Sequence, residues 1–179
     1  MRLVFLLSMC ALLALPGCAP LQFTAEVKGE TTVPASPLPA VLDVFPGIGS
    51  FTSLDFDQNQ DFQNQGVTKE QVASAKLQSV ALKILAPSDQ DFSFLDSLEF
   101  FARAGDREVK VASRSNISEL GLKAPHPVLE MKLEDVELQP FITAPSMSIV
   151  VRGRGRMPSK EVRLQADVKL DVQVKLVQP

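Results

Sequence analysis

The stretch VRLQADVKLDVQVKL, residues 162–176, alternates apolar and polar side chains without a break. A period of two residues is typical of a strand with one buried face, and no helix produces it. One apolar face and one charged face need a covering layer on one side only, which two antiparallel sheets packed face to face provide. The stretch therefore predicts an all-β fold. At about 3.4 Å per residue it would extend roughly 50 Å, so we expect it to bend or to pass from one sheet to the other.

Other segments support a β-sandwich. Residues 21–27 alternate in the same way, and residues 97–102 and 108–112 flank a turn and predict a hairpin. Residues 73–86 fit both helical and strand spacing, and we interpret them as a strand that follows a short helix begun by the capping box Thr68–Gln71. We expect a single domain over residues 21–179, immunoglobulin-like or a related antiparallel sandwich. It should have one or two short helical turns and a Pro- and Gly-rich loop at 33–50.

The N-terminus has the features of an export signal. Arg2 precedes an apolar run over residues 3–15, which is too short to cross a bilayer. The run ends in Leu15-Pro16-Gly17-Cys18, which resembles the lipobox of bacterial lipoproteins. The resemblance implies that residues 1–17 are a signal peptide cleaved between Gly17 and Cys18. It also implies that Cys18 carries fatty acyl chains such as palmitate, in a lipidated N-terminus at residues 18–20. An ordinary secreted protein with a chance cysteine is the alternative.

This resemblance predicts the membrane in which the protein is anchored, and it predicts that the mature chain has no internal disulfide. Two or three acyl chains anchor a protein stably to a cell membrane. Ala19 follows the cysteine in place of the Asp that retains known lipoproteins in the inner membrane, so we expect the outer membrane if the source has two. Cys10 leaves with the signal peptide, and the single remaining cysteine excludes a disulfide within the chain.

A wider likeness covers most of the predicted mature chain. Its segments are Gly66–Lys69, Leu77–Val80, Phe92–Glu99 and Ile142–Ser146. Together they resemble a group of uncharacterised bacterial surface lipoproteins. The resemblance implies an all-β fold and brings no catalytic motif.

Two polar patterns are candidate binding sites. Asp55, Asp57, Asn59 and Asp61 place oxygen ligands at every second position, as at the start of a calcium loop. Gln60 and Gly66 stand where an EF-hand needs Gly and Glu, so these are weak metal candidates, and a polar solvated face is the alternative.

The second pattern is a row of arginines. Arg152, Arg154 and Arg156 alternate with glycines, which places three guanidiniums on one side of an extended chain. Such a row suits phosphate or carboxylate. The alternative is a solvated sheet edge that charge protects against unwanted pairing.

The sequence gives little support for catalysis. His126 is the only histidine, which makes triads and zinc sites improbable. No serine lies in a nucleophile elbow, and phosphate-loop and dinucleotide fingerprints are absent. The acidic group Glu130, Glu134, Asp135 and Glu137 could pair for glycoside hydrolysis, but any acidic strand face would look the same. We expect no enzyme activity and no cofactor.

These observations predict a membrane-anchored bacterial lipoprotein that is a non-enzymatic binding or structural module of the cell envelope. Its partners would be the membrane, through the N-terminal lipid, and an envelope protein or surface polymer. A formal net charge of −3 gives no reason to expect nucleic acid. Two alternatives stay open: a carrier of lipid or another small ligand in a cavity between the sheets, and a calcium-dependent adhesion module.

Overall fold

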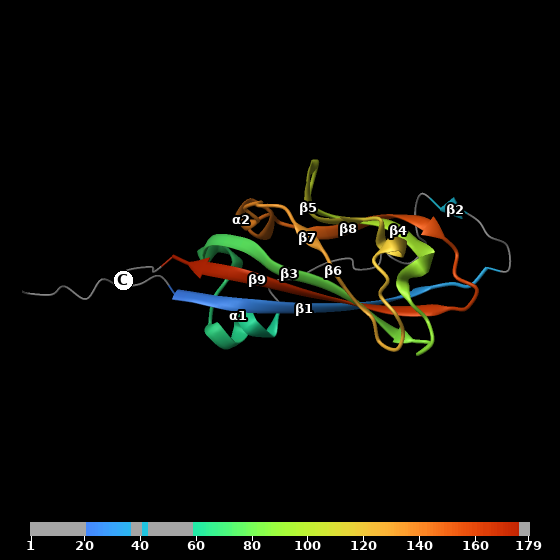
Figure 1. The fold of residues 1–179 in the computed structure, drawn as a ribbon. Helices are drawn as coiled ribbons and strands as arrows, with labels where there is room; N and C mark the ends of the chain where they lie inside the picture. The colour runs from blue at the N-terminus through green and yellow to red at the C-terminus, as the bar shows by residue number, and fades with distance from the viewer. Residues whose placement is uncertain (1–20, 37–40, 43–58, 176–179) are drawn as a thin grey trace, which may run out of the picture.

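The computed structural model describes residues 21–36, 41–42 and 59–175, and two antiparallel sheets dominate this part of the chain (Figure 1). Their inner faces share one hydrophobic core. The predicted all-β sandwich is therefore confirmed. The limits of the predicted signal peptide and single domain depend on residues outside these ranges and stay predictions.

The first sheet has four strands in the order β1-β9-β3-β6. They are β1 (Leu21–Val33), β9 (Val162–Val174), β3 (Val72–Ala86) and β6 (Val128–Glu130). Residues 162–174 of the alternating stretch that predicted the fold form β9, between β1 and β3. It pairs with β1 without a shift in register, from Leu21 opposite Val174 to Val33 opposite Val162. The strand does not pass to the second sheet, because both of its edges are paired within the first one along most of its length.

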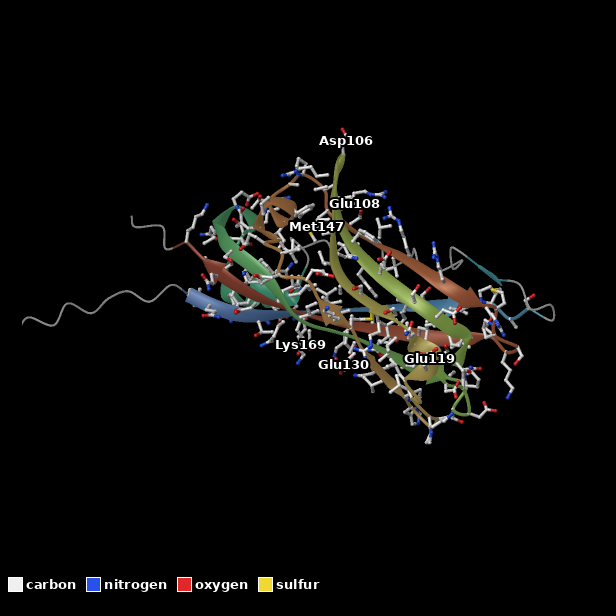
Figure 2. The ribbon with its side chains drawn as sticks, turned by 45° about the horizontal axis from the view of Figure 1, so that its top comes forward. Asp106, Glu108, Glu119, Glu130, Met147 and Lys169 are labelled. Atoms are coloured by element: carbon white, nitrogen blue, oxygen red, sulfur yellow. The ribbon has the colours of Figure 1, made fainter. Side chains whose placement is uncertain are left out.

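The second sheet has five strands in the order β2-β8-β4-β5-β7. They are β2 (Val41–Leu42), β8 (Ser148–Arg156), β4 (Leu95–Ala104), β5 (Arg107–Ser115) and β7 (Lys132–Leu133). The predicted hairpin is confirmed as β4 and β5. Gly105 has φ +58°, a left-handed conformation that glycine adopts without steric cost, and Asp106 lies at the hairpin tip (Figure 2). Of the predicted loop at 33–50, Val33 ends β1 and residues 41–42 form β2, while residues 37–40 and 43–50 lie outside the described ranges.

Phenylalanine and aliphatic residues fill the space between the sheets. The sequence has no Trp or Tyr, and Phe92 and Phe100 are 1% and 2% exposed. Leu82, Leu95, Leu98 and Leu164 have no exposed area. Each such side chain contributes about 1.5–3 kcal/mol through burial. The core that these residues form gives the outer faces a rigid support.

Short helices connect the strands. The described residues contain five: α1 (Gln60–Gln65), η3 (Lys69–Gln71), η4 (Phe92–Phe94), η5 (Ile117–Glu119) and α2 (Gln139–Ile142), more than the one or two turns that we expected. The capping box is confirmed, because the Thr68 N–H donates to Gln71 Oε1 at 2.8 Å, and residues 73–86 follow it as a strand. Within the described ranges no helix has the length and apolar character that spanning a membrane requires.

Candidate functional site

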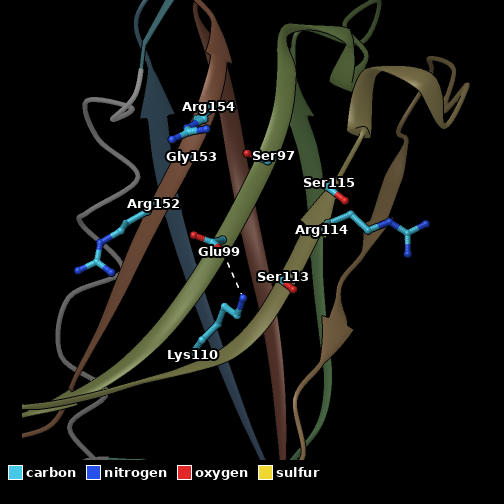
Figure 3. A pocket seen from close by; sticks show the side chains of 9 residues that line it. All are labelled: Ser97, Glu99, Lys110, Ser113, Arg114, Ser115, Arg152, Gly153 and Arg154. Carbon is cyan, nitrogen blue, oxygen red and sulfur yellow. Dashed lines mark hydrogen bonds and ion pairs between the residues drawn. The ribbon is translucent and has the colours of Figure 1, made fainter.

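A groove of about 540 Å³ opens on the outer face of the five-stranded sheet, across β8, β4 and β5 (Figure 3). Its lining is polar. The lining residues are Ser97, Glu99, Lys110, Ser113, Arg114, Ser115, Arg152, Gly153 and Arg154. We call this surface the basic groove.

Strand alternation places the arginines of β8 on the outer face. Val151, Gly153 and Gly155 are buried against the core, so Arg152, Arg154 and Arg156 are exposed on the other side. This confirms that the three guanidiniums share one side of an extended strand. Arg152 and Arg154 line the basic groove, and Arg156 lies further along the same strand.

Cross-strand pairing arranges the groove in two rows. In the first row, Ser97 of β4 lies between Arg154 of β8 and Ser115 of β5. In the second row, Glu99 lies between Arg152 and Ser113. Directly opposite residues on an antiparallel pair point to the same face of the sheet, so both rows lie on its outer face.

A bulge turns a lysine next to the second row toward the groove. The register of β4 and β5 shifts between Phe100 and Phe101, so Phe101 lies opposite Lys110 and Val111 is left without a partner. The Lys110 Nζ atom lies 3.3 Å from Glu99 Oε1, as the dashed line in Figure 3 shows. This ion pair lies inside the groove.

Arg152 is held at the rim by two neighbours. Its guanidinium lies 4.2 Å from the ring centroid of Phe101 and donates to Glu108 Oε1 at 2.7 Å. Arg103 donates to the other oxygen of Glu108 at 2.5 and 2.9 Å. The hydrogen bond from Arg103, followed by that from Arg152, lowers the pKa of Glu108. Glu108 therefore stays ionised and keeps Arg152 in place.

The groove is positive in an acidic chain. Four cations and one carboxylate line it, a formal balance of +3, whereas the whole chain has −3. The side chain of Arg114 points away from the other lining side chains (Figure 3), and the balance without it is +2. Arg154 already takes part in an interaction within the protein, but a guanidinium has five N–H donors and can serve several acceptors. The arrangement is suited to an oxyanion.

The outer face of the four-stranded sheet has a different charge pattern. A pocket of about 260 Å³ there is lined by Glu26, Lys28, Lys83, Asp167 and Lys169 with Val27 and Val168. Lys169 lies 2.9 Å from Glu26 and lowers its pKa, and Lys83 pairs with Asp167. Burial raises the pKa of Asp167, but hydrogen bonds from Lys83 and Gln165 outweigh it, and the pKa is lowered. The two carboxylates are thus matched across strands, so we interpret this face as structural.

The structure gives the calcium candidates another role. Asn59 and Asp61 bond to the edge strand β1: Asp61 Oδ2 accepts from the Glu26 N–H at 2.7 Å, and Asn59 Nδ2 donates to the Glu26 carbonyl at 3.0 Å. Asn59 also caps α1. The other two candidates, Asp55 and Asp57, lie outside the described residues, as do Gly17 and Cys18. Among the described residues no three His, Cys, Asp or Glu side chains gather as a metal site.

The acidic group at 130–137 holds other parts of the fold. Glu137 accepts from Ser74 and Ala75 of β3, and Asp135 lies 2.6 Å from Lys76.

His126 is exposed in the connection before β6 and does not line the basic groove. Sequence reasoning found Arg152 and Arg154. It missed the other charged and hydroxyl side chains of the lining, which are Ser97, Glu99, Lys110, Ser113, Arg114 and Ser115. The predicted hairpin was the one signal that could have placed Glu99 near Lys110.

Comparisons with known proteins give only distant likenesses. No family model and no curated protein matches the chain. The decameric BFDV capsid protein is 7% identical, with 88% of this chain and 100% of that chain covered and a TM-score of 0.37. Turnip yellow mosaic virus is 12% identical, with 100% and 93% covered and a TM-score of 0.31. Mud crab tombus-like virus is 9% identical, with 93% and 95% covered and a TM-score of 0.33.

These matches correct the function predicted from the sequence. A lipid-anchored envelope lipoprotein, with a membrane and an envelope protein or surface polymer as partners, is contradicted, because the matched structures are of viruses and of capsid proteins that form a decamer and a 60-mer. None of the matched structures named here is described as an enzyme. Likenesses this weak assign neither capsid function nor assembly to this chain. The carrier alternative is corrected as well, because large apolar side chains occupy the space between the sheets. The calcium-dependent adhesion alternative is corrected because Asn59 and Asp61 hold α1 on β1.

Proposed function

We propose that the protein is a non-catalytic β-sandwich that binds a phosphate-like oxyanion in the basic groove. The observation that carries the proposal is the gathering of cations and three serine hydroxyls from β8, β4 and β5 around one opening of about 540 Å³. Guanidinium donors match the geometry of phosphate oxygens, and an ammonium adds a compact charge. The hydroxyls of Ser97 and Ser115 can donate to the remaining oxygens, whereas the Ser113 hydroxyl already donates to Glu134 Oε1 at 3.4 Å.

The electrostatics of the chain support an anion over a cation. The lining cations outnumber the single carboxylate, Glu99, and that carboxylate is paired with Lys110. A cation would have to replace this lysine, whereas an anion can approach Lys110 and Arg154 together. The single histidine of the chain does not line the groove, so no general base of that kind stands beside the serines. This supports binding without turnover.

Titration calorimetry and thermal melting with sulfate and inorganic phosphate test the proposal. An anion that binds only the folded state raises the melting temperature, and Arg154→Gln and Lys110→Gln should each weaken binding about tenfold. Arg163→Gln is the matched control, because it removes one exposed arginine from β9, which belongs to the other sheet. Raising the salt concentration should weaken binding, since exposed charges are screened. Absence of binding, or equal loss in the control, overturns the proposal.

The predictions for the N-terminus are separate from this function. We propose that residues 1–17 are a cleaved export signal and that Cys18, after cleavage at Gly17, becomes the modified N-terminus. The support is the pattern of Leu15-Pro16-Gly17-Cys18 after an apolar run. An intact-mass measurement of the protein purified from its native cells tests it, and a full-length unmodified chain would contradict it.

A further inference from the structure

We infer that Asn116 is a site of N-linked glycosylation. It begins the sequence Asn116-Ile117-Ser118, which has the form N-x-S/T with a middle residue other than proline. Transferases that attach an oligosaccharide to the amide nitrogen of asparagine accept this sequence. The chain has two other asparagines, Asn59 and Asn64, and neither is followed two positions later by serine or threonine. The inference rests on the proposed export of the chain and not on the basic groove.

The fold places this acceptor sequence in a surface turn. Asn116 follows the last residue of β5 and begins η5, with its backbone in the left-handed region at φ 54°. Asn116 and Ser118 are exposed, whereas Ile117 between them is 1% exposed and anchors the turn in the core. A surface turn is the context that this sequence needs, because an attached oligosaccharide is bulky and polar and must extend into solvent.

The polar side chains of the acceptor sequence are not used within the fold. The Asn116 amide does not cap η5, and no side-chain hydrogen bond between described residues involves Asn116 or Ser118. By contrast, Asn59 donates to the Glu26 carbonyl and caps α1. A left-handed backbone favours asparagine at position 116. Backbone conformation makes no demand on residue 118, however, whereas the acceptor sequence requires its hydroxyl.

The reaction joins Asn116 to a sugar. The donor class is an oligosaccharide that is linked through pyrophosphate to a lipid. The Asn116 amide nitrogen forms a bond to the first sugar carbon, and the bond from that carbon to the pyrophosphate oxygen breaks. The lipid pyrophosphate leaves with the electron pair, the amide loses one proton, and nothing is oxidised or reduced. The export signal proposed at residues 1–17 would bring the chain to this donor.

Peptide mapping of the protein purified from its native cells tests the inference. Trypsin releases residues 115–123, which contain Asn116 and no other asparagine. We expect this peptide to carry an oligosaccharide, which a glycosyl amidase removes while it converts the asparagine to aspartate. The peptide that contains Asn59 and Asn64 should be unmodified and is the internal control.

Three variants produced in the same cells separate the acceptor sequence from the fold. Ser118→Ala and Asn116→Gly should abolish the modification, and Ser118→Thr should keep it, because threonine also supplies the hydroxyl. Glycine adopts the left-handed conformation without steric cost. The two variants without the modification should therefore melt at the same temperature, which shows that the turn is intact in both.

The outcomes distinguish this inference from the proposed export. If residues 115–123 are unmodified in a chain that lacks residues 1–17, only the inference is wrong. If they are unmodified in a chain that keeps residues 1–17, both are wrong. A sugar that persists in Ser118→Ala, or that maps to a serine hydroxyl, also overturns the inference, because it does not depend on the acceptor sequence.

Discussion

Glu137 joins the start of α2 to β3 by hydrogen bonds, and replacing Glu137 tests how much these bonds stabilise the fold. Its carboxylate accepts from Ser74 Oγ at 2.6 Å, from the Ala75 N–H at 2.7 Å and from the Gln139 N–H at 2.9 Å. Hydrogen bonds to a charged group contribute about 1.5–3 kcal/mol each when they are shielded, and much less when they are exposed, as two of these three are. We expect Glu137→Ala to lower the free energy of unfolding by about 2 kcal/mol. For a chain of this size that corresponds to a fall of roughly 4–8 °C in melting temperature.

The decrease in the free energy of unfolding that Glu137→Ala causes should depend on pH. Burial raises the pKa of Glu137, but hydrogen bonds from Ala75, Ser74 and Gln139 outweigh it, so the pKa lies below its ordinary value of 4.5. Between the folded and unfolded pKa values the unfolded chain binds more protons, and stability rises with pH. The contribution of the carboxylate is therefore complete above about pH 4.5 and is lost as the pH falls through the folded-state pKa.

Urea unfolding at pH 7 and thermal melts from pH 7 down to pH 3 measure both effects. Glu130→Ala is the control, because Glu130 is an exposed carboxylate on the short strand β6, and surface changes of this kind usually stay within about 0.5 kcal/mol. Wild type and Glu137→Ala should converge at low pH. A loss no larger than that of the control, or a difference that persists unchanged at pH 3, refutes the reasoning.

Three further changes probe α1 and the edge of β1. Phe62 is 2% exposed, and its ring lies 5.2 Å from that of Phe23, measured between centroids. Phe62→Ala should therefore lower the free energy of unfolding in urea by about 3 kcal/mol or more. A decrease below about 1 kcal/mol would show that α1 does not depend on this contact. Asp61→Ala should cost about 1 kcal/mol and speed hydrogen exchange at the Glu26 N–H, and unchanged exchange would contradict the bond. Gly66 has φ +62° and open space where a Cβ would stand, so Gly66→Ala should cost about 1 kcal/mol through backbone strain alone, and a neutral melt would exclude that strain.

The sequence predicted the fold best where alternation is unbroken, and β3 shows why it was ambiguous elsewhere. Ala75 and Leu77 lie opposite Val172 and Leu170 of β9, whereas Val80 and Leu82 lie opposite Val168 and Ala166. The inward positions thus change from odd to even at the bulge between Leu77 and Ser79. A change of phase within a strand produces three-residue spacings that imitate a helix. Only the pairing partner reveals the bulge.

The site was less predictable because its parts are far apart in the chain. Arginines on one side of β8 follow from local alternation, and the hairpin brings Glu99 toward Lys110. The pairing of β4 with β8 joins residues 45 to 60 positions apart, and hydropathy does not specify which strands become neighbours. The register shift that turns Lys110 toward the groove is likewise a property of the pair of strands.

Strand pairing places the charged side chains differently on the two outer faces. This difference directs the search for a ligand to the five-stranded sheet. Along β1 and β9 the register sets Glu26 opposite Lys169 and Lys28 opposite Asp167, so opposite charges meet directly across the strands. A slip of one residue would turn the apolar side chains outward and separate these pairs, so the charges on this face help to fix the register. On β8, by contrast, Arg154 lies opposite Ser97, and Arg152 lies opposite Glu99 but bonds to Glu108. Strand pairing alone does not account for the partners of these arginines, and a guanidinium has enough N–H donors to serve a bound oxyanion as well.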